Sequence, residues 1–426
     1  MSAQDGPALR AYLLAMRLAA PIAPFLLRRR LARGKEDPQR MGEKLGRATL
    51  ARPPGRLVWL HAVGLGEVMA LRGLIEAMAQ VAPDLSFLVT STARSSARVF
   101  GANLPPRTQH QFLPIDAPRY TRPFLDHWRP ALSVWSEQDL WPGIVRETAL
   151  RGVPLALVNV RLNDRAGGAR GRARGIYRDS YRRFALIGAQ DETSARALQA
   201  LGAPGPVPLH ASLKIGAPAL GCDGAVLEAL RRAFAGRTLW CVGSSHAEDE
   251  TVALAAHAAR LARDPAGCLI IAPRLVDRGA SIAAAARAAG FAVAARSTGA
   301  GPEGAAVYVA DTFGEMGLWY RLAPAVLMGG SFGPVEGHNP WEPARLGAAV
   351  LHGPRTANFA GDYARLDAAG AARMVADADA LAAALADPAT AAMPPRAEAL
   401  IAAGAGEIAA LARRIVALVP ARGGAA

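Results

Sequence analysis

Cysteine is scarce in this chain, and its few cysteines lack the spacing of a metal site or a disulfide framework. The 426 residues contain three, Cys222, Cys241 and Cys268. Cys241 and Cys268 lie in apolar runs and are expected to be buried strand residues. So few cysteines, in an odd number, argue against a disulfide-stabilised secreted fold and favour a reducing compartment. The histidines have no HxxxH or HExxH spacing, so no metal site is predicted.

The N-terminal apolar run is too short and too interrupted for a clean membrane-spanning helix. Residues 11–27 are largely apolar but include Arg17 and two prolines, and Arg28–Arg30 follow. A span needs about 20 apolar residues, and a signal peptide carries its charge before the apolar run. The pattern favours a monotopic membrane-associated segment, residues 1–47, whose cations attract anionic lipid headgroups. A soluble helix packed on the next domain is the alternative.

Acidic residues are outnumbered: 35 Asp or Glu stand against 49 Lys or Arg, a net charge of +14. This balance favours anionic partners such as phosphorylated substrates, anionic lipid or nucleic acid. Residues 28–47 and 161–183 each hold eight basic side chains. The first cluster lacks aromatic residues, and the tyrosines of the second fit an amphipathic helix. No nucleic-acid partner is therefore expected, and solvated loops are the simplest alternative for both clusters.

Short apolar runs alternate with amphipathic stretches, which predicts parallel sheets covered by helices on both faces. A Pro/Gly-rich stretch at 202–224 divides the chain into Rossmann-like domains at 48–212 and 213–426, the second ending in an Ala-rich helix. Ligands bind at the carboxyl ends of such strands, so both domains are expected to face one cleft. Strands are predicted at 57–61, 86–90, 131–135, 154–159, 184–188, 238–243, 268–273, 306–310, 325–329 and 349–352.

Three carboxylates of the first half follow predicted strands. Gly64 and Gly66 lie at a strand-to-helix turn, and Glu67 opens the helix. A carboxylate there faces the expected cleft, although it also suits the helix dipole without any catalytic role. Glu137 and Asp139 follow the predicted strand at 131–135. Their alternative role is to cap the helix that begins near Pro142.

Three segments of the second half suit a nucleotide. Residues 241–250 (CVGSSHAEDE) place a Ser/His turn before an acidic helix start, which is typical of a phosphate cradle or a capping box. Arg274 follows a strand end, where its guanidinium can bind phosphate through two hydrogen bonds. Residues 328–347 combine glycines with Asn339 and Glu342 at a helix start, and these groups suit phosphate and ribose hydroxyls.

These motifs have the order and spacing of the Kdo transferase family, the 3-deoxy-D-manno-octulosonic acid transferases of lipopolysaccharide biosynthesis. The chain resembles that family from about residue 40 to residue 375. The similar segments are RMGEKLG, HAVGLGE, EQDLWP, NVRLNDR, LKIG, SSHAEDE, APRLVDR, DTFGEMGLWY and GGSFGPVEGHNPWEP.

The resemblance implies a GT-B fold, in which an N-terminal domain takes a phosphorylated lipid A-type acceptor and a C-terminal domain takes the donor CMP-Kdo. It implies no cofactor, and one displacement that inverts the anomeric carbon. By motif position, Glu67 is implied as the general base and Glu137 as a second catalytic carboxylate. The residues implied to bind substrate or nucleotide are Gly66, Lys214, Ser244, Ser245, His246, Pro273, Arg274, Gly314, Glu315, Ser331, Gly337, His338, Asn339 and Glu342.

Four positions depart from the family pattern. The family has Ser in place of Gly64, Gly-Asn in place of 211–212, Gly in place of Glu248 and His-Pro-Glu in place of 275–277. These positions lie beside the expected cleft and leave open a different nucleotide sugar or envelope acceptor. A non-enzymatic scaffold is disfavoured because the motif carboxylates are retained.

Overall fold

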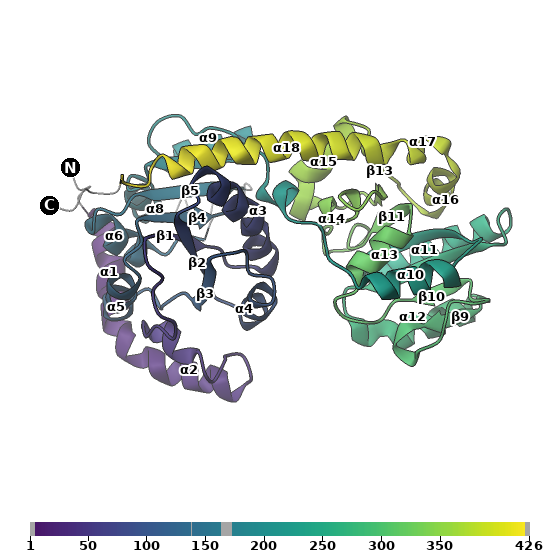
Figure 1. Ribbon diagram of the computed structural model, residues 1–426, viewed down its shortest axis with the longest axis horizontal. Coiled ribbons are helices and arrows are strands. Elements are labelled where there is room, and N and C mark those ends of the chain that lie inside the picture. The colour runs from purple at the N-terminus through teal and green to yellow at the C-terminus, as the bar shows by residue number, and fades with distance from the viewer. Residues whose placement is uncertain (1–4, 138, 163–172, 422–426) are drawn as a thin grey trace. The chain divides into compact units, whose positions relative to one another are not determined.

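The apolar runs form two separate parallel sheets in the computed structural model, which describes residues 5–137, 139–162 and 173–421. Gln138 of EQDLWP and residues 163–172, which overlap NVRLNDR and the second basic cluster, lie outside the described residues. The chain divides into two compact units (Figure 1), residues 1–217 with 404–426, and residues 218–403.

The first unit is built on a six-stranded parallel sheet of order β3-β2-β1-β4-β5-β6. Its strands are β1 (Arg56–His61), β2 (Leu85–Ser91), β3 (Thr108–Phe112), β4 (Leu132–Ser136), β5 (Leu155–Val160) and β6 (Leu186–Ala189). Its helices are α1 (Pro7–Ala19), η1 (Ala20–Ile22), α2 (Ala23–Ala32), η2 (Met41–Leu45), α3 (Leu65–Val81), α4 (Arg94–Gly101), α5 (Pro118–Trp128), α6 (Pro142–Leu150), α8 (Arg174–Tyr181), α9 (Glu192–Ala200) and η3 (Leu213–Gly216).

Five of these six strands are predicted from apolar runs, whereas β3 is not, because its sequence TQHQF is mostly polar. Two of its buried polar side chains form hydrogen bonds. Trp128 Nε1 donates to Gln111 Oε1 at 2.8 Å, and the Ser91 hydroxyl contacts His110 Nε2 at 2.9 Å. Hydrogen bonding thus allows a polar strand to lie under helices.

The second unit contains a seven-stranded parallel sheet of order β13-β12-β11-β7-β8-β10-β9. Its strands are β7 (Thr238–Ser245), β8 (Gly267–Pro273), β9 (Val293–Ala295), β10 (Val307–Val309), β11 (Ala325–Met328), β12 (Ala349–His352) and β13 (Ala372–Met374). The sequence does not predict β9 and β13, which have three residues each. Its helices are α10 (Gly224–Ala233), α11 (Ala247–Leu261), η4 (Val276–Arg278), α12 (Gly279–Ala288), η5 (Arg296–Thr298), α13 (Met316–Leu322), α14 (Trp341–Ala344), η6 (Ala357–Phe359), α15 (Ala360–Ala368), α16 (Ala378–Ala386) and α17 (Pro388–Ala391).

The last helix, α18 (Met393–Val416), is divided between the units. Its C-terminal part belongs to the first unit, where Glu407 accepts a hydrogen bond from the Ala211 backbone N–H at 2.7 Å. The sequence places everything after residue 213 in the second domain. It does not reveal this return, because the helix is uniformly rich in alanine.

The N-terminal segment is helical and bound to the first unit along one side. Tyr12 donates a hydrogen bond to Asp116 at 2.7 Å, and the Gly6 N–H donates to Asp179 at 2.7 Å. Of the described helices, the continuous stretch Pro7–Ala32 is the one long and apolar enough to cross a membrane by length and composition. The expectation that the segment is too short for a span is therefore wrong, because the helix extends beyond the apolar run at 11–27 on both sides. Only 17% of its most apolar window is buried, so its other side is exposed.

Two cations of the first basic cluster form ion pairs with buried carboxylates. Lys44 forms an ion pair with the buried Glu36 at 2.5 Å, and Arg40 pairs with the buried Glu43 at 2.9 Å. Glu43 also accepts a hydrogen bond from the Phe112 N–H at 2.8 Å. Each buried carboxylate therefore has a cation beside it, and the segment after α2 is fixed to the end of β3.

The close contact of α3 with η3 yields a stability prediction. A methyl group at Gly73 would lie 2.0 Å from the Gly216 carbonyl oxygen. Gly73→Ala should therefore lower the free energy of unfolding by about 1–3 kcal/mol, measured by denaturant titration. The matched control, Gly101→Ala at the end of α4, meets open space and should not destabilise the protein. Equal unfolding curves for the two variants would contradict the packing described.

Candidate active site

The strand order of the first sheet reverses direction between β1 and β4, which pair side by side. At such a switch point the chain leaves adjacent strands toward opposite faces, and the carboxyl ends form a crevice. β1 leads into α3, which carries Glu67 in its first turn, and Glu137 directly follows β4. The two carboxylates implied by the motifs are thus brought to one point.

Glu67 is held by the backbone in front of its own helix. Its Oε2 atom accepts hydrogen bonds from the N–H groups of Val63 and Gly64, both at 3.1 Å. This is the helix-start role that the sequence left as an alternative to catalysis. Its other oxygen, Oε1, has no hydrogen-bond partner in the part of the chain that the structure describes. One oxygen orients the carboxylate while the second is open to a ligand.

Glu137 has the left-handed backbone conformation, with φ of 65°. A non-glycine residue adopts it at a cost, so the fold must hold it there. The Glu137 N–H donates to the Val158 carbonyl at 2.9 Å, and Lys214 Nζ lies 3.6 Å from Glu137 Oε1. Burial raises the pKa of Glu137 to about 7. Lys214 lowers this pKa and the negative charge of Glu67 raises it, which places all three groups close together.

Asn159 is a site residue that the motif analysis did not select. It also has a left-handed backbone, with φ of 60°. Its Nδ2 donates to Glu137 Oε1 at 3.4 Å, and its Oδ1 accepts from the Leu213 N–H at 2.9 Å. One side chain thereby joins Glu137 to the turn that carries Lys214. The available signal was a polar residue at the end of an apolar strand, within NVRLNDR.

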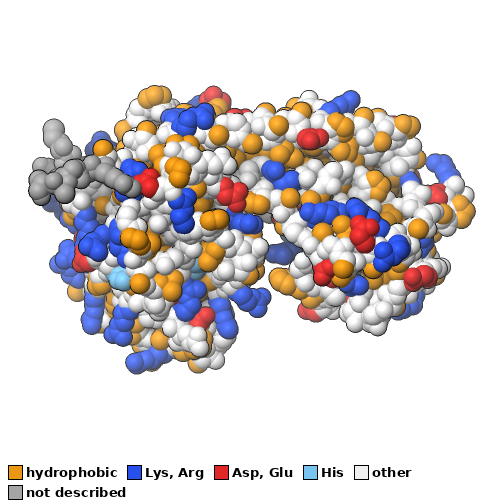
Figure 2. Space-filling view, viewed as in Figure 1, with side chains coloured by type: hydrophobic (Ala, Val, Ile, Leu, Met, Phe, Trp, Pro, Cys, Tyr) orange, Lys and Arg blue, Asp and Glu red, His pale blue; other side chains and the backbone are white. Residues whose placement is uncertain are grey.

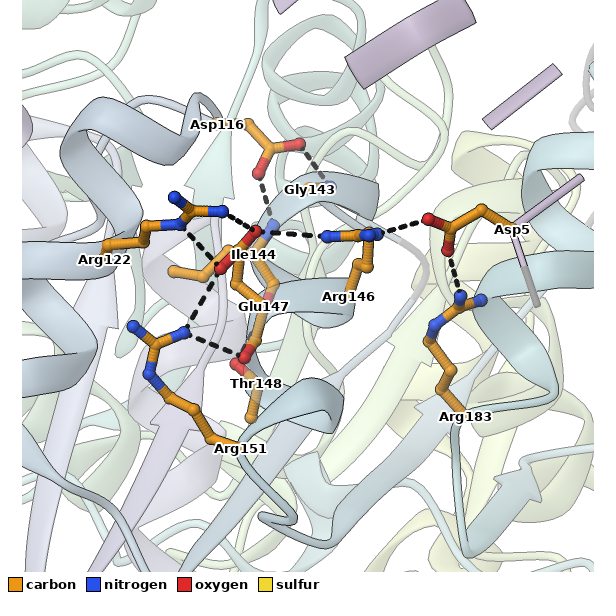
Figure 3. A network of polar contacts seen from close by, with 10 residues as sticks. All are labelled: Asp5, Asp116, Arg122, Gly143, Ile144, Arg146, Glu147, Thr148, Arg151 and Arg183. Carbon is orange, nitrogen blue, oxygen red and sulfur yellow. Dashed lines mark hydrogen bonds and ion pairs between the residues drawn. The ribbon is translucent and has the colours of Figure 1, made fainter. Parts of the chain in front are cut away.

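Two expectations for the first unit need correction. Lys214, assigned by sequence to the nucleotide domain, lies in the first unit beside Glu137. Neither Glu137 nor Asp139 caps α6. Asp116 does so, accepting from the N–H groups of Gly143 and Ile144 at 2.8 and 2.6 Å (Figure 3). Asp116 lies before α5, so only the tertiary structure brings it to this helix.

The second sheet has its own switch point between β7 and β11. At the end of β7, Ser244 has φ of 54°, and the Ser245 hydroxyl donates to Glu250 at 2.9 Å. His246 precedes α11, and its N–H donates to Asp249 at 2.9 Å. This is the acidic helix start expected from the sequence, with the serines on the strand itself and not in a loop.

Asp249 also holds the neighbouring loop. Its carboxylate accepts from the N–H groups of Gly330, Ser331 and Phe332 at 2.6, 3.1 and 3.2 Å. Burial raises the pKa of Asp249, and these backbone donors oppose that rise. A single buried side chain therefore fixes the loops after β7 and β11 relative to each other.

Five of the predicted residues form one group at the carboxyl edge of the second sheet. His246 Nε2 lies 3.0 Å from His338 Nε2, with the rings stacked, and Asn339 Nδ2 donates to Glu342 at 3.4 Å. Burial raises the pKa of Glu342, and the Asn339 hydrogen bond and the cation of Arg274 oppose that rise. The same cation lowers the pKa of His338. Burial lowers the pKa of His338 to about 4, so its ring is neutral at pH 7. The group offers one cation, one carboxylate and neutral donors.

Other predicted residues have partners elsewhere or act through the backbone. Glu315, which follows Gly314, pairs with Arg296 at 2.9 Å. The buried Ser331 hydroxyl donates to the Met328 carbonyl at 2.6 Å, so it is occupied within the fold. The Gly337 N–H donates to the Gly330 carbonyl at 2.8 Å, with Gly337 at φ of 85°. Pro273 is buried at the end of β8, and Gly66 is exposed at the start of α3.

Two all-parallel α/β units, each with polar groups at its switch point, are the architecture of glycosyltransferases of the GT-B fold. A solved glycosyltransferase from Rickettsia africae aligns with a TM-score of 0.57, covering 85% of this chain and 98% of that one. At 8% identity this likeness concerns the fold alone.

Sequence relatives narrow the class. A family model described as 3-deoxy-D-manno-octulosonic-acid transferase (kdotransferase) matches residues 39–217. The 3-deoxy-D-manno-octulosonic acid transferase of Bordetella pertussis is 34% identical over 390 residues, 86% of this chain and 88% of that protein. A probable mitochondrial transferase of the same name from Arabidopsis thaliana is 33% identical over 350 residues, 80% and 78% of the two chains. The chain belongs to the Kdo transferase family.

The surroundings of Glu137 predict how its pKa responds to substitution. Glu67→Gln removes a repelling negative charge and should lower the pKa of Glu137 from about 7. Lys214→Met removes a stabilising cation and should raise it. Carboxyl-carbon NMR titration measures both changes, and shifts of the same sign in the two variants would contradict the geometry.

The same raised pKa predicts a pH dependence of stability. The pKa of Glu137 in the folded protein lies above its ordinary value of 4.5. The stabilising contribution of Glu137 to the free energy of unfolding is therefore fully present below pH 4.5 and is lost as the pH rises through 7. Relative to Glu137→Gln, the wild type should lose up to about 3 kcal/mol of unfolding free energy between pH 4.5 and pH 8. Parallel stability curves for the two proteins would argue against a buried, ionising Glu137.

Proposed function

We propose that the chain transfers Kdo from CMP-Kdo to a phosphorylated lipid A-type acceptor, with inversion at the anomeric carbon. Membership of the Kdo transferase family supports the sugar. The observation that carries the mechanism is Glu67, with one carboxylate oxygen fixed by two backbone N–H groups and the other open. A carboxylate oriented in this way is suited to accept a proton from an acceptor hydroxyl.

In the proposed reaction, the acceptor oxygen forms a bond to the anomeric carbon while the bond to the CMP phosphate breaks. The hydroxyl proton goes to Glu67, and the bonding electrons leave with CMP. A single displacement inverts the configuration and passes through an oxocarbenium-like state. The Glu137–Lys214 pair lies beside Glu67, and we propose that Lys214 contacts the substrate while Glu137 sets the local charge.

In the second unit, Arg274, His338, Asn339 and Glu342 support nucleotide binding. We propose that the Arg274 guanidinium binds the phosphate and stabilises the departing CMP. Glu342, oriented by Asn339 at 3.4 Å, is proposed to accept hydrogen bonds from the ribose hydroxyls. The neutral His338 ring adds a donor without adding charge.

We further propose that the protein works at the cytoplasmic face of the inner membrane. Exposed apolar side chains of α1 and α2, such as Leu18 and Phe25, support this location. Basic side chains surround that region on the visible face (Figure 2), and cations near an anionic bilayer each add to attraction. A lipid-linked acceptor resides at the same surface.

The catalytic assignment of Glu67 predicts a loss of turnover without a loss of nucleotide binding. Glu67→Gln keeps the side-chain shape and removes its basicity, so turnover should fall by roughly 10²–10⁴-fold. CMP affinity should change little, since the proposed nucleotide residues belong to the other unit. Glu76→Gln, an exposed position on the same helix, is the control and should remain active. If Glu67→Gln lost only about 0.3–1 kcal/mol of stability and stayed active, its role would be helix capping.

The donor assignment predicts selectivity among nucleotides. CMP should raise the melting temperature, whereas UDP and GDP should not. Glu342→Ala should weaken CMP binding because the hydrogen bonds from the ribose hydroxyls are lost. Each hydrogen bond to a charged carboxylate contributes about 1.5–3 kcal/mol of binding free energy. Glu303→Ala, at an exposed position of the same unit, should bind CMP like the wild type. An equal melting shift with UDP would favour a different nucleotide sugar.

A further inference from the structure

A basic groove lies between α1 and α5 of the first unit. It is separate from the candidate site that contains Glu67 and Glu137. Two adjoining cavities of about 440 and 330 Å³ share Arg17, Pro118 and Arg122 in their walls. Arg119 lines the first cavity. The groove thus brings together five arginines from three helices: Arg10 and Arg17 of α1, Arg119 and Arg122 of α5, and Arg146 of α6.

The charges at the groove are only partly compensated. Glu147 accepts hydrogen bonds from Arg122, Arg146 and Arg151, and Asp5 pairs with Arg146 and Arg183 (Figure 3). Glu147 is therefore shared among three guanidinium groups and Asp5 between two.

By contrast, neither Arg17 nor Arg119 has a carboxylate partner among residues 5–137, 139–162 and 173–421. The first turn of α5 also lacks an acidic residue and a side-chain cap, so its N-terminus adds partial positive charge. The fold leaves an excess of positive charge at this groove.

Apolar side chains continue from the groove along α1 and α2. Leu14, four residues before Leu18, lines the second cavity. Leu14, Leu18 and Phe25 are 56%, 70% and 65% exposed. Because Arg17 lies between Leu14 and Leu18, an anion at the groove would have an apolar surface directly beside it. This combination of a cationic groove and an apolar surface matches an amphiphile that carries a phosphate.

We propose that this groove binds the phosphate of an anionic phospholipid headgroup, with Arg17 and Arg119 as its ligands and Arg122 held beside them by Glu147. The acyl chains lie against the exposed leucines. This inference rests on the proposed membrane association and adds a defined lipid site to it. A bound lipid would join α1 to α5 and so fix how the first unit stands on the membrane.

The test compares two doubly substituted proteins that lose the same charge. Arg17→Gln with Arg119→Gln removes the two groove ligands. Arg28→Gln with Arg29→Gln removes two exposed arginines from α2 that do not line the groove. Binding is measured by co-sedimentation with phosphatidylcholine vesicles, with and without phosphatidylglycerol, at constant ionic strength.

General attraction to an anionic surface predicts about a fivefold loss of affinity for each cation removed, in both proteins. The groove protein should lose roughly a further tenfold or more on vesicles with phosphatidylglycerol, because charge-assisted hydrogen bonds are also lost. On pure phosphatidylcholine the two proteins should bind alike. If the two proteins lost affinity equally on vesicles that contain phosphatidylglycerol, the proposed site would be overturned.

Two further measurements separate the remaining possibilities. If inorganic phosphate raised the melting temperature through Arg17 and Arg119 while vesicle binding stayed equal, the groove would bind free phosphate and the lipid proposal would be wrong. Leu18→Ser with Phe25→Ser tests membrane association itself. If this variant bound vesicles like the wild type, the proposed membrane association through α1 and α2 would be wrong. Sugar transfer to a detergent-dissolved acceptor should be unchanged in the groove variant, so failure of the proposed enzymatic function would be seen separately.

Discussion

The side-chain amide of Asn159 is the contact on which the candidate site of the first unit depends. It meets Glu137 on one side and holds the 213–216 turn, with Lys214, on the other. Both Asn159 and Glu137 adopt left-handed backbone conformations at the ends of adjacent strands. Strain of this kind persists only where surrounding contacts impose it. Here the result is a carboxylate whose pKa lies near 7, beside a second carboxylate and a lysine.

In the second unit, one carboxylate holds the loops at the switch point in place. Asp249 accepts backbone hydrogen bonds from the ends of two neighbouring strands, at His246 and at 330–332. In both units, therefore, a buried polar side chain fixes the loops at the switch point. Buried polar networks that are fully hydrogen-bonded rigidify the structure around them. Ser244, at φ of 54°, marks the same edge of the second sheet.

Much of the fold was predictable because parallel strands buried on both faces are nearly continuous apolar runs. The predicted runs became strands in both sheets, and Glu67 and Glu137 were found from their positions after strand ends. The polar strand β3 escaped prediction because pairs such as His110 with Ser91 are not visible in a local pattern. The site assignments rest on motif position, and they stay predictions until substrate or turnover is measured.

The sequence by itself determined the alternation of strands and helices, the family, and which polar residues follow strand ends. These are local properties, set by side-chain polarity and spacing along the chain. Only the tertiary structure decided that Lys214 faces Glu137, that Asp116 caps α6 and that the end of α18 returns to the first unit. It also placed Arg17 beside Arg119. Each of these pairings joins residues distant in sequence, and burial and hydrogen bonding choose such partners only once the chain is folded.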